Sequence, residues 1–250
     1  MTPKEALQRL LEGNARFISG HRSIGAAPSA HQRVELARFG QSPFAIVLAC
    51  SDARVPAEIV FDCGLGDLFV VRVAGNIVAP SLVGSIEFAV ENFATPLVLV
   101  LGHTQCGAVR AAMDLACGRD PGFSANIHSI LSEIAPSVAR LSPFDHEASA
   151  RQVVERNVRR SLTQLEVRSE ALKRHVTTGR VALVGGVYDL ETGVVSLLAG
   201  PDHADSGSGS TSGEGDDGKG GKKSDKRLQS HSDFFPVKLD ANFSPTLNRS

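Results

Sequence analysis

Residues of types that bind soft metal ions follow two apolar stretches of the chain. Cys50 comes directly after residues 44–49, and His103 and Cys106 come after residues 97–101. Two thiolates and one imidazole suit Zn²⁺, and three protein ligands leave the fourth tetrahedral position open for water. Zinc lowers the pKa of such a water toward ~7 and so supplies hydroxide at neutral pH. These residues therefore predict one catalytic zinc ion per subunit.

A carboxylate and a guanidinium follow Cys50 closely. Asp52 is placed to orient the zinc-bound hydroxide by accepting its hydrogen bond. Arg54 is placed to hold that carboxylate ionised and turned away from the metal through a bidentate pair. An unpartnered Asp52 would instead ligate the zinc and produce an inactive, closed site. The alternative interpretation is a surface ion pair, and such pairs contribute only about 0–1 kcal/mol.

Taken alone, the His103-x-x-Cys106 motif is a weak signal, because short motifs of this kind have a high false-positive rate. A structural zinc site would close its shell with a fourth Cys or His. Cys63 lies beside an expected turn and Cys117 lies well along an expected helix, so both are poorly placed for that role. Together with Cys50 and the carboxylate–guanidinium pair, the motif favours an open, catalytic site.

The apolar segments predict an α/β fold with a central, mostly parallel β-sheet flanked by helices. We expect parallel strands at 44–49, 68–73, 97–101 and 181–187, and an antiparallel edge strand at 194–198. In such a sheet, the carboxyl ends of neighbouring strands lie at one edge, where ligands bind. Cys50 should therefore meet His103 and Cys106 at that edge.

Helical segments are expected between these strands and at the start of the chain. Thr2, Pro3 and Glu5 form a capping-box pattern that predicts an N-terminal helical arm. The other expected helices are 31–38, 56–61, 81–93, 107–116, 123–141 with an interruption at Pro136, and 145–175 as one long helix or two.

Composition predicts one sizeable globular domain. The chain has 250 residues, 42% of them hydrophobic, with a formal net charge of -1 and a pI near 6.7. This balance gives no electrostatic reason to expect binding to nucleic acid or to an anionic membrane. No apolar stretch approaches the ~18 residues of a membrane-spanning helix, and no signal peptide is expected. Thiolate ligands need a reducing setting, so we expect a cytoplasmic protein.

The composition changes after Pro201. We expect a zinc domain over residues 1–201, a disordered linker of Gly, Ser and charged residues over 202–232, and a short segment over 233–250. Phe234 and Phe235 restore apolar character to that last segment. It is either a docking motif for a protein partner, a segment that packs back on the domain, or an inert tail.

Four stretches of the chain resemble the β-class carbonic anhydrases, in order and at familiar spacing. They read ACSDARVPAE at 49–58, GDLFVVRVAGN at 66–76, GSIEFAV at 84–90 and GHTQCGAV at 102–109. The match runs from about residue 7 to about residue 198 and includes L-x-E-G-N-x-R-F at 10–17. The resemblance implies a zinc enzyme that converts CO₂ reversibly to bicarbonate and a proton. Zinc-bound hydroxide would attack CO₂, oriented by the Asp52/Arg54 dyad.

The resemblance also implies an assembly and a substrate pocket. The N-terminal arm would pack on a second subunit, in a homodimer or an assembly of dimers. Cys63, Phe88 and Gly102 would line the substrate pocket, although many relatives carry Gln and Tyr at the first two positions. Candidates for proton transfer, which the residues alone do not rank, are His21, His31, His128 and Tyr188.

Some relatives have a regulated form in which the aspartate ligates zinc and bicarbonate occupies a non-catalytic pocket of Trp, Arg and Tyr. Arg72 and Tyr188 stand at two of these positions, but Val47 stands where the Trp would be. We therefore predict an open site at neutral pH, in which Asp52 is not a ligand.

Two competing functions follow from the same residues. Relatives of this fold hydrolyse CS₂ or carbonyl sulfide, and the sequence does not exclude such a linear substrate. Alternatively, the chain is a tethered interaction protein with little activity, recruited through residues 233–250 to a bacterial microcompartment such as a carboxysome.

Overall fold

The computed structural model describes residues 1–21, 23, 29–138 and 146–198. A five-stranded sheet has the order β2-β1-β3-β4-β5. Its parallel strands are β1 (Ala45–Cys50), β2 (Leu68–Val73), β3 (Leu97–His103) and β4 (Ala182–Tyr188), and β5 (Val195–Leu197) is antiparallel to β4. The predicted mostly parallel sheet with an antiparallel edge strand is therefore confirmed. The predicted linker 202–232 and segment 233–250 lie outside the described residues.

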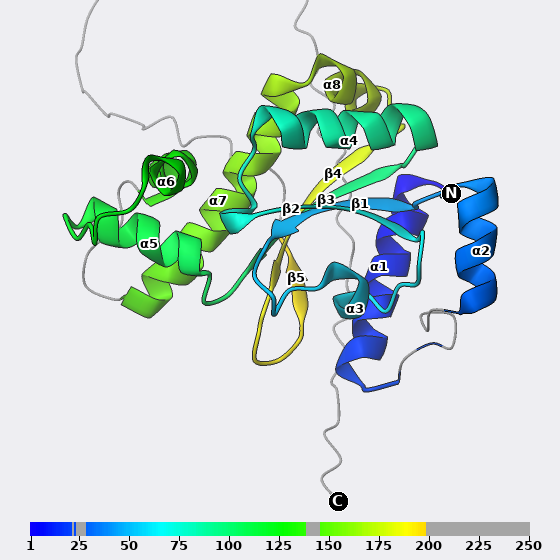
Figure 1. Cartoon of the computed structure of the whole chain (residues 1–250), viewed down its shortest axis with the longest axis horizontal. Helices are drawn as coiled ribbons and strands as arrows, with labels where there is room; N and C mark the ends of the chain where they lie inside the picture. The colour runs from blue at the N-terminus through cyan, green and yellow to red at the C-terminus, as the bar shows by residue number, and fades with distance from the viewer. Residues whose placement is uncertain (22, 24–28, 139–145, 199–250) are drawn as a thin grey trace, which may run out of the picture. The chain divides into compact units, whose positions relative to one another are not determined.

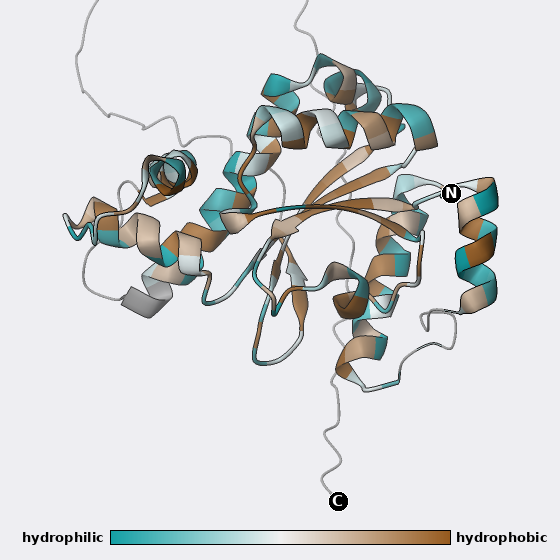
Figure 2. Cartoon of the chain, in the orientation of Figure 1, coloured by the Kyte–Doolittle hydropathy of each residue, from teal (hydrophilic) through white to brown (hydrophobic). Residues whose placement is uncertain are grey.

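The central strands are apolar along their whole length because both faces of the sheet are covered. Every residue of β1 and β3 is buried, and Figure 2 shows the strands as continuous hydrophobic ribbons. Parallel pairing sets Ala49 opposite Leu101 and Cys50 opposite Val73. The carboxyl ends of β1, β2 and β3 therefore lie at the same edge of the sheet.

Helices cover the two faces of the sheet (Figure 1). One face packs against α4 (Pro80–Phe93) and α7 (His146–Arg168), with α5 (Gly107–Ala116), α6 (Ala125–Val138) and α8 (Glu170–Thr177) beside them. The other face packs against α1 (Pro3–Ile18) and α3 (Ala57–Val60). The remaining helix is α2 (Ala30–Phe39), and a 3₁₀ turn follows β2 at Ala74–Asn76. No helix of the described residues is long and apolar enough to span a membrane.

The N-terminal helix begins with the predicted capping box. Glu5 N–H donates to the Thr2 hydroxyl at 3.3 Å, and Thr2 N–H donates to the Glu5 carboxylate at 2.7 Å. The expectation that a second subunit receives this helix stays a prediction, and within the single chain the helix packs on the core. The reason is Asn14, which is 4% exposed. Its amide donates to the carbonyls of Val60 and Gly193 and accepts from Val195 N–H at 2.9–3.1 Å.

The structure corrects the expected interruption of one helix and shows that another expected segment forms two helices. Helix α6 continues through Pro136 instead of being interrupted there. Pro136 lies in the last turn, where the lost backbone bond disrupts little, and the buried Ile134 anchors the turn before it. The segment expected as one helix or two is two, because Ser169 begins α8 by accepting Leu172 N–H on its hydroxyl at 3.0 Å.

Candidate metal centre

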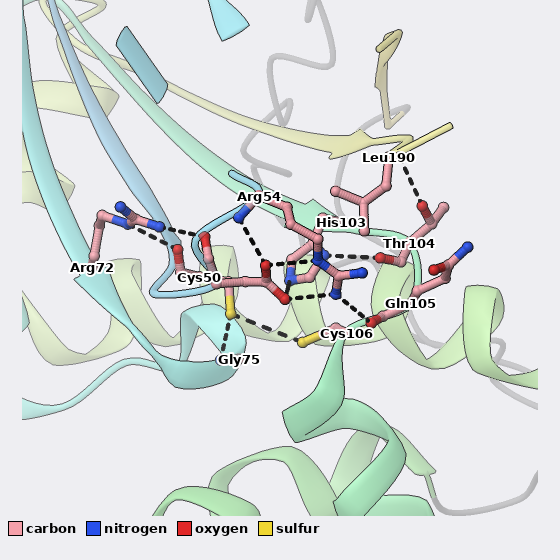
Figure 3. Close-up of polar contacts among 10 residues, drawn as sticks. Cys50, Arg54, Arg72, Gly75, His103, Thr104, Gln105, Cys106 and Leu190 are labelled. Carbon is pink, nitrogen blue, oxygen red and sulfur yellow. Dashed lines mark hydrogen bonds and ion pairs between the residues drawn. The ribbon is translucent and has the colours of Figure 1, made fainter. Parts of the chain in front are cut away.

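Two neighbouring strands deliver the metal-ligand candidates to the carboxyl edge of the sheet. Cys50 is the last residue of β1, and His103 is the last residue of β3. Cys106 is the residue before α5 begins at Gly107. Since β1 and β3 are adjacent and parallel, the turn after β3 brings Cys106 back beside Cys50. The structure thus brings together the predicted ligands, as Figure 3 shows.

The three candidate ligand atoms form a compact, buried group. The sulfurs of Cys50 and Cys106 and a ring nitrogen of His103 all lie within 4.8 Å of one another. The two sulfurs are 4.0 Å apart. Cys50 is 5% exposed, Cys106 is 4% exposed and His103 is fully buried. This spacing fits one ion bound by two sulfurs at ~2.3 Å and one nitrogen at ~2.0 Å.

The hydrogen bonding of His103 leaves one nitrogen for a metal. Its Nδ1 lies 2.8 Å from the Thr104 carbonyl, an acceptor, so Nδ1 carries the proton and donates it. Nε2 is buried and has no hydrogen-bond partner among the described residues. An unsatisfied buried polar atom of this kind costs about 1–3 kcal/mol. A metal ion at Nε2 would remove that cost, and a carbonyl that accepts a hydrogen bond from the other ring nitrogen is typical of histidine ligands. The residues present therefore fit a zinc ion.

The thiols of Cys50 and Cys106 interact directly with each other. The Cys106 side chain hydrogen-bonds to Cys50 and, with further donors, holds the pKa of Cys50 below its usual value against the effect of burial. One further donor is the Gly75 N–H, 3.3 Å from the sulfur. The pKa of Cys106 is raised because its thiol hydrogen-bonds to Cys50 and is buried. A divalent cation would stabilise both as thiolates.

Asp52 and Arg54 form the predicted bidentate pair. Arg54 Nε donates to Oδ1 at 2.9 Å, Nη2 donates to Oδ2 at 2.8 Å, and the Arg54 backbone N–H donates to Oδ1 at 2.9 Å. The side-chain hydrogen bonds from Arg54 are the main reason that the pKa of Asp52 lies well below its usual range. Asp52 Oδ2 lies 4.0 Å from His103 Nε2. The carboxylate is thus held next to the ligand group.

Arg72 braces the loop that carries this carboxylate, a role that sequence reasoning missed. Its Nε donates to the Cys50 carbonyl at 2.9 Å and its Nη2 donates to the Asp52 carbonyl at 2.6 Å (Figure 3). The sequence-based interpretation related Arg72 only to a Trp–Arg–Tyr trio. Val47 is fully buried and Tyr188 is 5% exposed, both within the core beneath α1 and α3. Arg72 precedes Val73, the residue of β2 that pairs with Cys50. Its place near the end of an expected strand was the available hint that it lies beside Cys50.

The residues expected in the substrate pocket have three different surroundings. Cys63 is 7% exposed and lines a cavity of about 250 Å³ with Arg16 and Asp62 among its neighbours. Phe88 is 53% exposed on α4 and packs edge-on against Phe93. Gly102 is buried against α7. Their assignment to one pocket stays a prediction.

The candidate proton carriers also have different surroundings. His31 lies 3.7 Å from Glu35, and His128 lies 3.2 Å from Asp120, both near the surface. His21 is exposed. Their roles stay untested.

Comparison with known proteins identifies the family. The family model described as carbonic anhydrase matches residues 45–195. Carbonic anhydrase 2 of Mycobacterium tuberculosis is 40% identical over 192 residues, covering 76% of this chain and 90% of that protein. The carbonic anhydrase of Mycolicibacterium smegmatis is 40% identical over 202 residues, covering 78% and 93%.

Solved structures share the fold. The β-carbonic anhydrase CcaA superposes with a TM-score of 0.62 at 26% identity, covering 76% of this chain and 94% of that one. A tetrameric β-carbonic anhydrase from Sordaria macrospora gives 0.59 at 22% identity, covering 68% and 88%. With the family model spanning most of the described sheet and close relatives matched over nearly their full length, the chain belongs to the β-carbonic anhydrase family of enzymes.

Proposed function

We propose that the chain interconverts CO₂ and bicarbonate at a single zinc ion held by Cys50, His103 and Cys106, with Asp52 and Arg54 as the catalytic pair. The observation that carries this proposal is the position of the Asp52 carboxylate. It lies 4.0 Å from the unpartnered Nε2 of His103, and Arg54 holds it by three hydrogen bonds.

Zinc in such a site lowers the pKa of a water molecule and so supplies a nucleophile at neutral pH. Asp52 contributes orientation: as an ionised acceptor, it fixes the direction of the attacking oxygen by accepting a hydrogen bond. Arg54 keeps that carboxylate ionised and fills three of its roughly four acceptor sites, which leaves one for the attacking oxygen. Arg72 donates to the carbonyls of Cys50 and Asp52 and so fixes the loop that carries the Asp52 carboxylate relative to Cys50.

The same contacts support an open site at neutral pH. Asp52 would have to leave Arg54 to become a metal ligand, and would thereby lose the bonds from both the side chain and the backbone of that residue. Charge-assisted, bidentate bonds of this kind are the strong ones in proteins. A zinc shell that contains the Asp52 carboxylate at pH 7.5, seen by crystallography, would contradict this part of the proposal.

The test is a stopped-flow CO₂ hydration assay on full-length protein whose zinc content has been measured. Cys50→Ser should lose zinc and activity together, and Asp52→Asn should keep zinc but lose activity by about 10²-fold, because the amide no longer acts as an ionised acceptor. Asp114→Asn is the matched control, since Asp114 pairs with Arg119 in an exposed ion pair at 2.5 Å. Zinc-loaded wild-type protein without CO₂ hydration, or with faster turnover of CS₂, would overturn the proposal.

We further infer a homodimer, or an assembly of dimers, working in the cytoplasm. Large apolar side chains are exposed on the single chain, including Phe39 at 83%, Phe88 at 53% and Val34 at 44%. Scattered exposure is ordinary, but covering these side chains in a dimer would remove apolar surface from water. Thiol ligands also require a reducing compartment. Light scattering after size exclusion gives the mass, and a monomer at micromolar concentration would contradict the assembly.

A further inference from the structure

Helix α7 packs tightly against the ends of the strands next to the candidate metal centre. Gly102 directly precedes His103, and a Cβ at Gly102 would lie 2.7 Å from Val158 Cγ2 and 2.9 Å from Val154 Cγ1. A Cβ at Gly185 in β4 would lie 2.8 Å from Val158 Cγ1. The helix therefore packs directly against the backbone of both strands, and its inward-facing side chains have fixed positions relative to His103.

Two of those side chains hold the turn at Ala74–Asn76. Asn157 Nδ2 donates to the Gly75 carbonyl at 2.7 Å, and Ser161 Oγ, one helical turn further along, donates to the Asn76 carbonyl at 3.0 Å. Asn157 is 2% exposed and Ser161 is 1% exposed, so water does not replace these donors. The turn needs such support because Gly75 and Asn76 have φ values of 71° and 43°, in the left-handed region.

The turn in question contacts the metal centre. The Gly75 N–H points at the sulfur of Cys50, with a nitrogen–sulfur distance of 3.3 Å, in Figure 3 as well. A side chain at position 75 would be strained, because φ is 71° and a Cβ there would lie 2.6 Å from Ile134 Cδ1 and 3.2 Å from the Ala108 Cβ. Hydrogen bonds to a ligand atom fix its direction and tune its charge, and their loss typically costs 10–100-fold in metal affinity.

We propose that Asn157 is a positioning residue for the metal ligand Cys50. By holding the Gly75 carbonyl, Asn157 keeps the Gly75 N–H directed at the Cys50 sulfur and so slows the loss of the metal ion. Asn157 itself touches neither the ligand atoms nor the substrate in this role. The proposal rests on the metal centre proposed above, but not on the reaction performed there.

Ser161 provides the matched comparison. Both residues lie on the same face of α7, are almost fully buried and donate to carbonyls of the same turn. Only the Asn157 bond goes to the residue whose N–H contacts Cys50. A merely structural role would make the two substitutions equivalent for metal binding, and a positioning role makes them differ.

The experiment measures zinc dissociation from full-length, zinc-loaded protein into excess chelator. Asn157→Ala should release zinc about tenfold faster than wild type or more. Asn157→Asp should do likewise, because its carboxylate repels the Gly75 carbonyl while keeping the shape of asparagine. Ser161→Ala should stay close to wild type. With Co²⁺ in place of zinc, the thiolate-to-metal charge-transfer band should shift in both Asn157 variants and not in Ser161→Ala.

Equal zinc release from the Asn157 and Ser161 variants, or an unmoved charge-transfer band, would overturn the proposal. If Asn157→Ala does not fold, the rate of zinc release from Asn157→Asp tests the proposal. Failure of both to fold would assign Asn157 to the core and count against positioning. Because the readout is metal retention, wild-type protein that hydrates no CO₂ would defeat the catalytic proposal while leaving this one standing.

Discussion

The Arg54 side chain donates two parallel hydrogen bonds to the Asp52 carboxylate, at 2.9 Å and 2.8 Å. The same carboxylate lies 4.0 Å from His103 Nε2. In the function proposed above, this guanidinium decides whether the acid orients a reactant or becomes a metal ligand. Arg54 also donates to the Gln105 carbonyl at 3.3 Å, which ties the loop after β1 to the loop after β3. The two segments that carry Cys50, His103 and Cys106 are therefore connected through Arg54.

Replacing Arg54 with lysine should separate charge from geometry. Lysine keeps the positive charge but cannot make two parallel bonds, so Asp52 becomes free to turn toward the metal. We expect kcat/KM for CO₂ hydration to fall about 10²-fold with zinc content unchanged. X-ray absorption at the zinc edge should show an added oxygen ligand. Arg119→Lys, in an exposed pair with Asp114, is the control. Full activity in Arg54→Lys would exclude the bidentate bond as a requirement.

Asp62 should make stability depend on pH. Burial by itself raises the pKa of this fully buried side chain, but Arg16 at 2.6 Å and the Ser23 N–H outweigh it, and the net pKa is lowered. A lowered folded-state pKa stabilises the protein above the unfolded value of ~3.9, and this stabilisation disappears as the pH falls through the folded value. Asp62→Asn should cost about 2 kcal/mol at pH 7. Urea unfolding should show a smaller difference near pH 3, and a constant difference would contradict the linkage.

Two glycine-to-alanine changes should have opposite signs. Gly102→Ala places a Cβ against Val158 and Val154 and should cost about 1–3 kcal/mol in unfolding free energy. Gly84→Ala, in the exposed part of α4 with nothing within 4 Å, should add about 0.5–1 kcal/mol. Thermal unfolding checks both. A change in KM without a loss of stability in Gly102→Ala would instead place Gly102 in the substrate pocket.

The cysteines outside the metal centre should differ in reactivity. Burial, with Asp67 nearby, raises the pKa of Cys63 to about 12, whereas Cys117 is exposed. The thiolate is the reactive form, so iodoacetamide at pH 8 should label Cys117 at least about 100-fold faster in zinc-loaded protein. Mass spectrometry of peptides measures the two rates, with Cys117→Ser as the control. Comparable labelling of Cys63 would show that its cavity opens to solvent.

Residue types and their order already indicate the candidate metal ligands and the strands that carry them. Cys50, His103 and Cys106 are recognisable by type and spacing, and the apolar continuity of 44–49 and 97–101 predicts buried parallel strands. The capping box at Thr2 is likewise local, because a side chain and a backbone N–H three residues apart must meet in a first helical turn.

The groups that support those candidate ligands become visible only in the folded chain. The Gly75 N–H at Cys50, the Asn157 amide at Gly75 and the arm packed through Asn14 on its own core all join residues distant in sequence. Residue type records what a side chain can donate or accept. The direction of a backbone N–H, and the space beside a glycine, depend on how separate elements pack, and they exist only once the chain has folded.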